Sequence, residues 1–378
     1  MKAMAMITAV DAVATLRKGR TVLNFGAGPA MLPNSILREL QEELPNHHGS
    51  GISVLEMNHR SSSFQKIIDQ AEQDVRELML IPDDYAILFL HGGATLQFAM
   101  APMNLLGNHT SVNYANTGYW SARAIREAGR FCSVHLAVDA NESGYMEIPP
   151  QKQWHVDDNG AYLHYTVNET IGGVEFHWLP DSHGLPLVAD MTSMVLSRPM
   201  DVSSHALIYA ATQKNLGIAG LTLVIVRRNA LQPVPVGTPS MLDYREHIQA
   251  HSLFNTPPVF AWYVAAKMLT WVKAQGGLTA MAERNQRKSA ILYKLLDSSD
   301  IYENHVEPTC RSWMNVPFKF ADQKLELSFL REAEAAGFVG LAGHRSVGGL
   351  RASLYNAMPE AGVCALADFM REFERRHA

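Results

Sequence analysis

The sequence predicts an α/β protein with a large, mainly parallel sheet and a smaller α+β domain at its C-terminal end. Three observations support this prediction. Apolar runs of strand length alternate with helical segments from about residue 64 to residue 228. These runs are apolar on both faces, as in parallel strands that helices cover on each side. After a proline-rich stretch at 230–258, the pattern changes to long helices and an α+β tail.

The elements follow in order along the chain. A helix is expected at 64–79, where apolar side chains recur at helical spacing after three serines able to cap it. Seven strands are expected, at YAILFLHGG, TSVNYA, CSVHLAV, AYLHYT, LPLVADM, HALIYAA and LTLVIVRR. Two further helices are expected at TLQFAMAPMNLL, which Pro102 should distort or break, and at YWSARAIREAG. The C-terminal part is expected to hold helices at FAWYVAAKMLTWVKAQ, LTAMAERNQRKSAILYKLL and GVCALADFMREFERR.

These elements suggest two domains and an extension. Residues 30–270 are expected to form the large domain, and residues 271–378 the small one together with a segment at about 21–29. Residues 1–20 are rich in Ala and Met and carry three basic residues near their end. We expect a disordered extension there, and the alternative is an organelle presequence.

The composition limits the classes of function. The chain has 378 residues, of which 47% are hydrophobic and 18% charged, as in ordinary globular proteins. A net charge of -5 and a pI near 6.3 argue against a general nucleic-acid binder. Three distant cysteines, Cys132, Cys310 and Cys364, indicate neither a disulfide framework nor a metal site. No apolar run is long enough for a membrane span, and a cytoplasmic location is expected.

Polar and small residues follow several of the predicted strands. In open α/β sheets, ligands bind beyond the carboxyl ends of the strands. Lys214 follows an apolar strand, and burial lowers the pKa of a lysine toward the range in which its amine is a nucleophile or base. A lysine that forms a Schiff base with pyridoxal phosphate needs a carboxylate for the ring nitrogen, and Asp190 could supply it. The strand ends therefore point to pyridoxal-phosphate chemistry.

Other strand-end residues fit the same cofactor. The turn HGGATLQF, with Ala94 and Thr95, could hold a phosphate through backbone N–H groups and the helix dipole. Trp120 offers a flat face for the ring, Thr170 a hydroxyl for its phenolic oxygen, and Gln213 an amide for the phosphate. Each residue alone more often has a structural role, such as a turn aspartate, a core tryptophan or a surface lysine. The prediction depends on their joint occurrence.

Motifs along nearly the whole chain resemble the phosphoserine aminotransferases, which are class V, fold-type I pyridoxal-phosphate enzymes. They run in the family's order from about Asn24 to the C-terminal end. These motifs are NFGAGPAMLP, EMNHRSSSF, HGGATLQFAMAPMNLLG, NETIGG, ATQKNLGIAGLTLVIVR, SLFNTPPVFAWY, RSWMNVPF and GHRSVGGLRASLYNAMP. The resemblance implies the fold-type I architecture and amino-group transfer.

The resemblance also implies roles for single residues. Lys214 would carry the cofactor, Asp190 would face the ring nitrogen, and Gln213 would bind the phosphate. Trp120 would stack on the ring and Thr170 would bind its oxygen. The FNTPP loop would bring Asn255 and Thr256 to the cofactor phosphate of a neighbouring subunit, so a homodimer with shared sites is expected.

The implied substrates are glutamate and 3-phosphohydroxypyruvate, which would give 2-oxoglutarate and 3-phosphoserine in serine biosynthesis. Two pairs, His59 with Arg60 and His344 with Arg345, resemble the family's phosphate-binding groups, and Arg351 its clamp for the α-carboxylate. Arginine suits both anions because its planar fork matches their oxygens. The family also implies possible use of phosphohydroxythreonine in pyridoxine biosynthesis.

Two positions depart from the family pattern. Ala27 stands where some relatives have a serine, so only backbone contacts are expected there. Ala94 and Thr95 stand where others have Gly-Arg, which removes a positive charge from the phosphate turn. Three alternatives were open: an alanine–glyoxylate type of class V aminotransferase, a cysteine desulfurase, and an inactive binding protein with this fold. Neither Cys310 nor Cys364 lies where a desulfurase would need its nucleophile.

Overall fold

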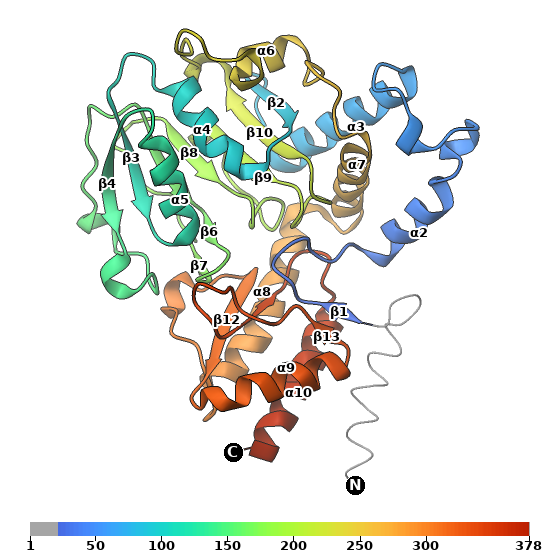
Figure 1. Ribbon diagram of the computed structural model, residues 1–378, viewed down its shortest axis with the longest axis vertical. Coiled ribbons are helices and arrows are strands. Elements are labelled where there is room, and N and C mark those ends of the chain that lie inside the picture. Colours follow the sequence, from blue (N-terminus) through green and yellow to red (C-terminus); the bar gives the residue numbers. More distant parts are fainter. Residues whose placement is uncertain (1–21, 378) are drawn as a thin grey trace.

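The computed structural model describes residues 22–377, and a large upper part of the molecule rests on a smaller lower part (Figure 1). The extension expected at residues 1–20 lies outside the described residues. Within residues 22–377, the helices are too short or too polar to span a membrane. Each part has a hydrophobic cluster of its own.

The large part contains the predicted seven-stranded sheet. Its strand order is β2-β10-β9-β8-β5-β3-β4, and only β10 runs antiparallel to its neighbours, so the mainly parallel sheet is confirmed. The bounds are β2 (Tyr85–Leu90), β3 (Ser111–Asn116), β4 (Ser133–Asp139), β5 (Leu163–Thr166), β8 (Leu187–Asp190), β9 (Leu207–Ala211) and β10 (Thr222–Arg227). The central strands are buried on both faces, as their continuous apolar runs predict.

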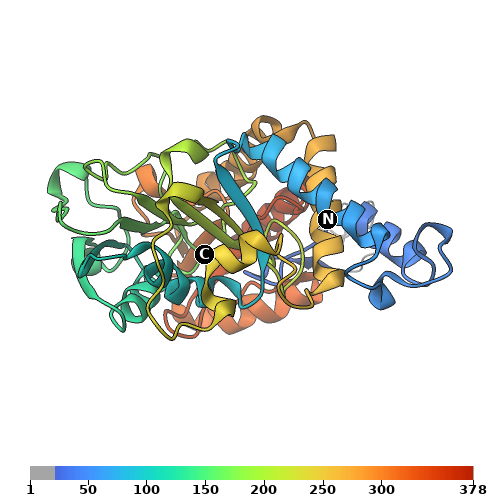
Figure 2. The same ribbon diagram turned by 90° about the horizontal axis from the view of Figure 1, so that it is seen from above.

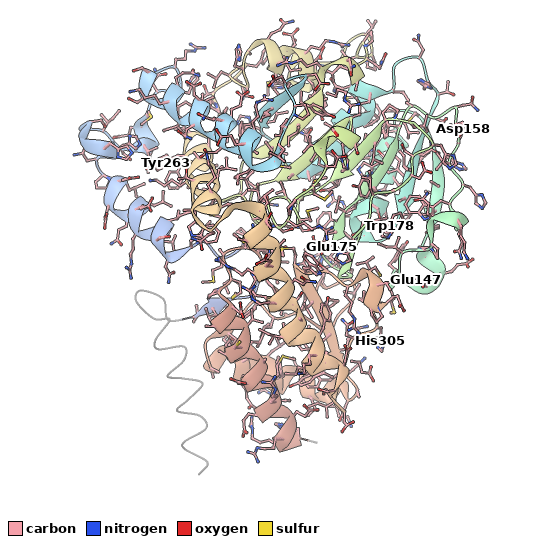
Figure 3. All side chains as sticks on the ribbon, turned by 180° about the vertical axis from the view of Figure 1, so that it is seen from behind. Glu147, Asp158, Glu175, Trp178, Tyr263 and His305 are labelled. Carbon is pink, nitrogen blue, oxygen red and sulfur yellow. The ribbon has the colours of Figure 1, made fainter. Side chains whose placement is uncertain are left out.

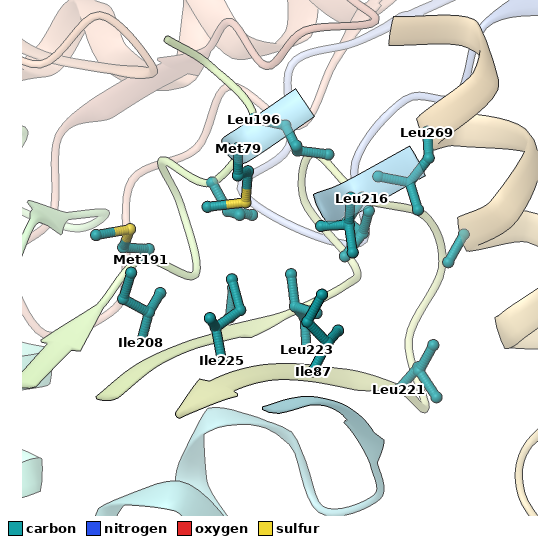
Figure 4. Close-up of a cluster of buried hydrophobic side chains, with 14 of the residues drawn as sticks. Met79, Ile87, Met191, Leu196, Ile208, Leu216, Leu221, Leu223, Ile225 and Leu269 are labelled. Atoms are coloured by element: carbon teal, nitrogen blue, oxygen red, sulfur yellow. The ribbon is translucent and has the colours of Figure 1, made fainter. Parts of the chain in front are cut away.

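Helices cover both faces of the sheet, as the view from above shows (Figure 2). One core lies between the sheet and the helices α3 (Ser62–Met79) and α7 (Val259–Ala274), and the other lies beneath α4 (Gly93–Leu105) and α5 (Tyr119–Ala128). Leu223 belongs to the first core and Val224 to the second, because successive side chains of a strand point to opposite faces. Leu216, two residues after Lys214, is also anchored in the first core (Figure 4).

Local sequence explains where two of these helices begin and end. The Ser61 hydroxyl accepts a hydrogen bond from the Phe64 N–H at 3.2 Å and caps α3, as the serine run predicts. The expectation that Pro102 would distort or break the next helix is wrong in its stronger form, because α4 continues to Leu105. Pro102 leaves only one carbonyl without its helical N–H donor, and the Asn104 side chain bonds the Met100 carbonyl at 2.9 Å nearby.

The small part is built from both ends of the described chain. Its elements are β1 (Leu23–Asn24), β11 (Tyr302–Glu303), β12 (Asn315–Phe320), α9 (Glu326–Ala335), β13 (Phe338–Val339), β14 (Leu350–Ser353) and α10 (Glu360–His377). β1 pairs with β13 in parallel, so residues after 21 join the C-terminal core. α8 (Gly277–Asp297) contributes Met281 to the large core and Leu292 to the small one. The domain boundary near residue 270 therefore stays a prediction.

Three shorter segments complete the large part. α2 (Asn34–Glu43) lies at one end of the molecule, and the blue segment that follows it projects outward (Figure 2). α6 (Tyr244–Gln249) precedes the loop that leads into α7. A small hairpin of β6 (Asn168–Glu169) and β7 (Val174–Glu175) lies between β5 and β8 in the chain, close to the small part (Figure 1).

Candidate active site

Lys214 lies in the turn after β9, with 8% of its surface exposed. Its Nζ donates a hydrogen bond of 2.6 Å to the Thr170 hydroxyl, which follows β6. Burial lowers the pKa of Lys214 to about 8; the Asp190 carboxylate opposes this shift and the Arg351 guanidinium adds to it. An appreciable fraction of the amine is therefore neutral near neutral pH, as a nucleophile or base requires.

Asp190 ends the neighbouring strand β8 and is buried. Its Oδ1 accepts a hydrogen bond of 2.9 Å from the Thr192 N–H. Burial raises the pKa of Asp190, while the bonds from Thr192 and the charge of Lys214 oppose the rise. No cation of residues 22–377 lies within ion-pair distance of this carboxylate. The site thus presents a buried anion that favours a cationic ligand atom.

Trp120 stands in the first turn of α5, and the centre of its indole ring is 5.9 Å from the Lys214 Nζ. Its Nε1 is buried, and no acceptor in the described chain bonds it. Buried indole N–H groups usually have a partner, so this atom points to a missing one. The indole lies where a flat ring bound to Lys214 could pack against it.

The turn before α4 is shaped to receive an anion. Gly92 and Gly93 have φ values of 88° and 63°, in the left-handed region that glycine adopts without strain. A Cβ on Gly92 would lie 2.5 Å from the Leu96 side chain, so no other residue fits. The first turn of α4 has no acidic residue and no side-chain cap, which leaves its N–H groups for a ligand. Thr95 in this turn is exposed.

Arg351 on β14 brings the small part to the same place. Its Nη1 donates to the Thr170 carbonyl at 3.2 Å, so Thr170 binds Lys214 through its side chain and Arg351 through its backbone. The Arg351 side chain is buried, and its Nε has no acceptor in the region the structure describes. Burial lowers the pKa of Arg351. Its guanidinium therefore has donors left for an anionic substrate.

The predicted residues His344 and Arg345 lie in the loop before β14. The His344 ring is 5.3 Å from the ring of Tyr119, the residue before Trp120. Burial, with the charges of Arg351 and Arg345, lowers the pKa of His344. Arg345 is exposed beside it. This loop thus borders the entrance to the site.

Other predicted residues are not brought to this centre within one chain. His59 and Arg60 lie between α2 and α3, and no hydrogen bond, ion pair or ring contact within residues 22–377 joins them to Lys214, Asp190, Trp120 or Arg351. Asn255 and Thr256 lie between α6 and α7. Gln213 is half-buried beside Lys214. Ala27 offers only its carbonyl, which accepts a hydrogen bond of 2.8 Å from the Tyr355 hydroxyl.

Sequence reasoning missed Glu169, the residue before Thr170. Its side chain is fully buried, and its carboxylate accepts the backbone N–H groups of Trp120 and Ser121 at 2.9 and 2.8 Å. The only signal in the sequence is an acidic residue inside a stretch that should be buried, at NET. Nothing local pairs it with a helix that begins about 50 residues earlier.

Known proteins resemble this chain over nearly its whole length. The family model described as aminotransferase class-V matches residues 22–366. The chain is 51% identical to the phosphoserine aminotransferase of Nitrosomonas europaea, over 95% of this chain and all of that protein. It also resembles the solved structure of phosphoserine aminotransferase from Bacillus circulans subsp. alkalophilus, with 41% identity, a TM-score of 0.92, and coverage of 94% and 99% of the two chains. The PLP-bound phosphoserine aminotransferase from Trichomonas vaginalis is 37% identical, with a TM-score of 0.89 and coverage of 93% and 99%.

Proposed function

Because the chain belongs to the class V aminotransferases and, among them, to the phosphoserine aminotransferases, we propose that it transfers the amino group of glutamate to 3-phosphohydroxypyruvate. The products are 3-phosphoserine and 2-oxoglutarate, and the reaction is reversible. The observation that carries the proposal is a buried group of three charged residues: Lys214 and Arg351 both contact Thr170, and the Asp190 carboxylate is close enough to oppose the lowering of the Lys214 pKa.

The residues of the site fit pyridoxal phosphate. Lys214 would bind its aldehyde carbon, Asp190 would pair with its ring nitrogen, and Trp120 would cover its ring. The turn at Gly92, Ala94 and Thr95, with Gln213, would hold its phosphate through backbone and side-chain donors. An unpaired buried carboxylate and an indole N–H without an acceptor both match such an occupant. When bound, the cofactor supplies a ring that accepts the electrons released from the amino acid's Cα–H bond.

The chain's own residues supply the proton transfer. Once the substrate's amino group has replaced it on the cofactor, the Lys214 Nζ, with its pKa lowered to about 8, could accept the proton of the substrate's α-carbon and donate it again on the same side of the site. The Thr170 hydroxyl holds this amine at 2.6 Å and so restricts its position between the two steps. The Asp190 carboxylate forms no ion pair within residues 22–377. It would therefore stabilise a proton on the ring nitrogen of the cofactor.

Substrate recognition would depend on the cations of the small part. The buried Arg351 would bind the α-carboxylate, and His344 with Arg345 would bind the phosphate or the side-chain carboxylate. The protein as a whole carries a net charge of -5, so these local cations must act against an unfavourable overall charge. A phosphorylated acceptor gains more from them than an unphosphorylated one does.

We propose a homodimer that completes each site. No contact within residues 22–377 joins His59, Arg60, Asn255 or Thr256 to Lys214, and we assign their predicted roles to the site of a neighbouring subunit. Exposed apolar side chains near these residues support such an interface: Leu37, Leu44, Ile52, Leu55 and Phe254. A groove of about 820 Å³ between α2, α3 and α7 adjoins the segment that connects α2 to α3.

Finer aspects stay predictions. A cytoplasmic location and a second role in pyridoxine biosynthesis through phosphohydroxythreonine rest on the family alone. Of the alternatives, an alanine–glyoxylate type of enzyme is not favoured, because identity above 50% over nearly the full chain is to a protein named phosphoserine aminotransferase. The buried lysine, aspartate and arginine also argue against an inactive binding protein.

The substrate assignment can be tested with purified protein. Glutamate-dependent amination is measured on 3-phosphohydroxypyruvate, hydroxypyruvate and glyoxylate under the same conditions. We expect kcat/KM for the phosphorylated acceptor to exceed the others by about 10²-fold or more, which is about 3 kcal/mol of binding to the phosphate. Equal values for 3-phosphohydroxypyruvate and hydroxypyruvate, or a preference for glyoxylate, would contradict the proposal.

A further inference from the structure

The tripeptide Asn168-Glu169-Thr170 contacts several parts of the site at once. The Asn168 side-chain amide donates to the Ser193 hydroxyl after β8 and to the Asn315 side chain of β12, both at 2.9 Å. Thr170 binds Lys214 and Arg351. Glu169, between them, binds the start of α5. Three successive residues therefore connect the Asp190 loop, the Lys214 turn, the Trp120 helix and the small part.

Glu169 is held in one arrangement. Each of its two carboxylate oxygens accepts one backbone N–H, from Trp120 at 2.9 Å and from Ser121 at 2.8 Å. A Cβ on Gly118 would lie 2.5 Å from the Glu169 Cδ, so this close approach requires a glycine before the helix. Charge-assisted bonds at a helix N-terminus are among the stronger hydrogen bonds in proteins. Small movements of α5 relative to β6 would break one of them.

The surroundings show why a carboxylate is tolerated here. The Glu169 side chain is fully buried, and no Lys, Arg or His of residues 22–377 forms an ion pair with it. Burial raises its pKa, and the bonds from Ser121 and Trp120 oppose that rise. A side chain used only for packing would not need a charge at this depth. The two N–H groups of α5 stabilise the buried carboxylate, and the carboxylate in turn fixes their position.

We propose that Glu169 is a positioning residue, whose carboxylate fixes the first turn of α5 so that Trp120 presents its indole to the cofactor beside Lys214. The inference rests on the proposed function, because it names the cofactor as what Trp120 meets. Thr170 directly follows Glu169. The same short segment therefore holds both the start of α5, which carries the Trp120 indole, and the Lys214 amine. Release of Glu169 would loosen the indole while the Lys214–Thr170 bond stays.

The chain offers a matched control. Glu175 pairs with Asn168 across the same hairpin, is fully buried, and accepts the backbone N–H of another tryptophan, Trp313, at 2.8 Å. It also forms an ion pair with Arg198 at 3.1 Å, and Figure 3 shows Glu175 in the view from behind. Glu175→Gln therefore perturbs a buried carboxylate of the same hairpin without touching α5.

The test compares Glu169→Gln with Glu175→Gln. Hydrogen–deuterium exchange of the cofactor-free proteins is followed over 118–125, and binding of pyridoxal phosphate is titrated by visible absorption and circular dichroism. An amide side chain can accept only one of the two N–H groups and turns its NH₂ toward the other. We expect exchange at Trp120 and Ser121 to rise at least about tenfold in Glu169→Gln, with about tenfold weaker cofactor binding and a reduced dichroic band. Glu175→Gln should change none of these.

Three results would overturn the inference. Unchanged exchange over 118–125 in Glu169→Gln would show that the carboxylate does not hold the turn. Faster exchange with unchanged cofactor affinity and dichroism would reduce Glu169 to a helix cap without influence on the indole. If the unaltered protein bound no pyridoxal phosphate, the proposed function would fail, and the inference, which names the cofactor, would fail with it. Should Glu169→Gln not fold by far-ultraviolet circular dichroism, Glu169→Asp, whose shorter carboxylate cannot reach both N–H groups, is measured with the same expectations.

Discussion

Lys214 and Lys288 are two buried lysines in very different surroundings. Lys288 on α8 is fully buried, and its Nζ donates to the carbonyls of Leu354, Tyr355 and Met358 at 2.6, 2.8 and 3.1 Å. Among residues 22–377, the Lys214 amine has one hydrogen-bond partner, the Thr170 hydroxyl. Burial lowers the pKa of both lysines. The difference teaches that burial alone does not make a lysine reactive, because all three donors of Lys288 are already used.

The largest expected effect is on activity. Lys214→Ala should lose the visible absorption of the bound cofactor, and turnover should fall about 10³-fold or more, because both the attachment point and the proton carrier are lost. Lys288→Met should keep the visible band and most of the turnover. Both are measured by absorption spectra and initial rates. A folded Lys288→Met protein without the visible absorption of the bound cofactor would contradict the distinction between the two lysines.

A second prediction concerns stability without cofactor, where replacing the two lysines should have effects of different size. The pKa of Lys214 falls from its usual 10.5 to about 8 in the folded protein, so at pH 7 the buried charge costs about 3 kcal/mol. Lys214→Met should therefore raise the free energy of unfolding at pH 7 by roughly that amount. Lys288→Met should bring a smaller gain, although burial also lowers the pKa of Lys288, because three buried carbonyls lose their donor.

The sign with pH follows from the same shift. The unfolded chain binds the Lys214 proton more tightly, so the penalty is complete below pH 8, shrinks as pH rises from 8 to 10.5, and then disappears. The gain of Lys214→Met should shrink over that range, as urea unfolding at several pH values would show. A gain independent of pH would mean that packing, not charge, causes it.

The smallest effect is expected at the entrance to the site. Arg345 is exposed, so Arg345→Ala should raise KM for 3-phosphohydroxypyruvate by about tenfold, as expected for losing one charge-assisted contact. The KM for glutamate should change less, since a carboxylate carries less charge than a phosphate. Lys324→Ala, which removes an exposed cation of the small part that does not line the pocket beside His344 and Arg351, is the control. Equal changes for both substrates would indicate a structural role.

The sequence predicts the centre of the site better than its supports. Lys214 and Asp190 end neighbouring parallel strands, and strand ends meet at one edge of a sheet, so their proximity follows from the alternating pattern. Thr170 could be named because the NET motif resembles the family's. The hydrogen bonds between Glu169 and α5 could not be predicted, because tertiary packing joins residues about 50 positions apart and no local pattern encodes it.

Two other outcomes have the same cause. The helix through Pro102 survives because neighbouring packing outweighs one lost backbone bond, a balance that propensity does not contain. Both His-Arg pairs carry the residue types of phosphate sites, and within residues 22–377 it is His344, with Arg345 beside it, that contacts Tyr119 next to Trp120 and senses the charge of Arg351. The role proposed for His59 and Arg60 requires a second subunit, which the pattern of a single chain does not specify.

The central claim is that Lys214, whose amine has donors left for a ligand, carries the cofactor, and that Lys288, whose three donors are all used, does not. The protein is loaded with pyridoxal phosphate, reduced with borohydride, digested and analysed by peptide mass spectrometry. The account predicts one modified peptide per chain, with the cofactor mass on Lys214. A label on Lys288 or any other lysine, or no label in folded protein saturated with cofactor, would contradict it.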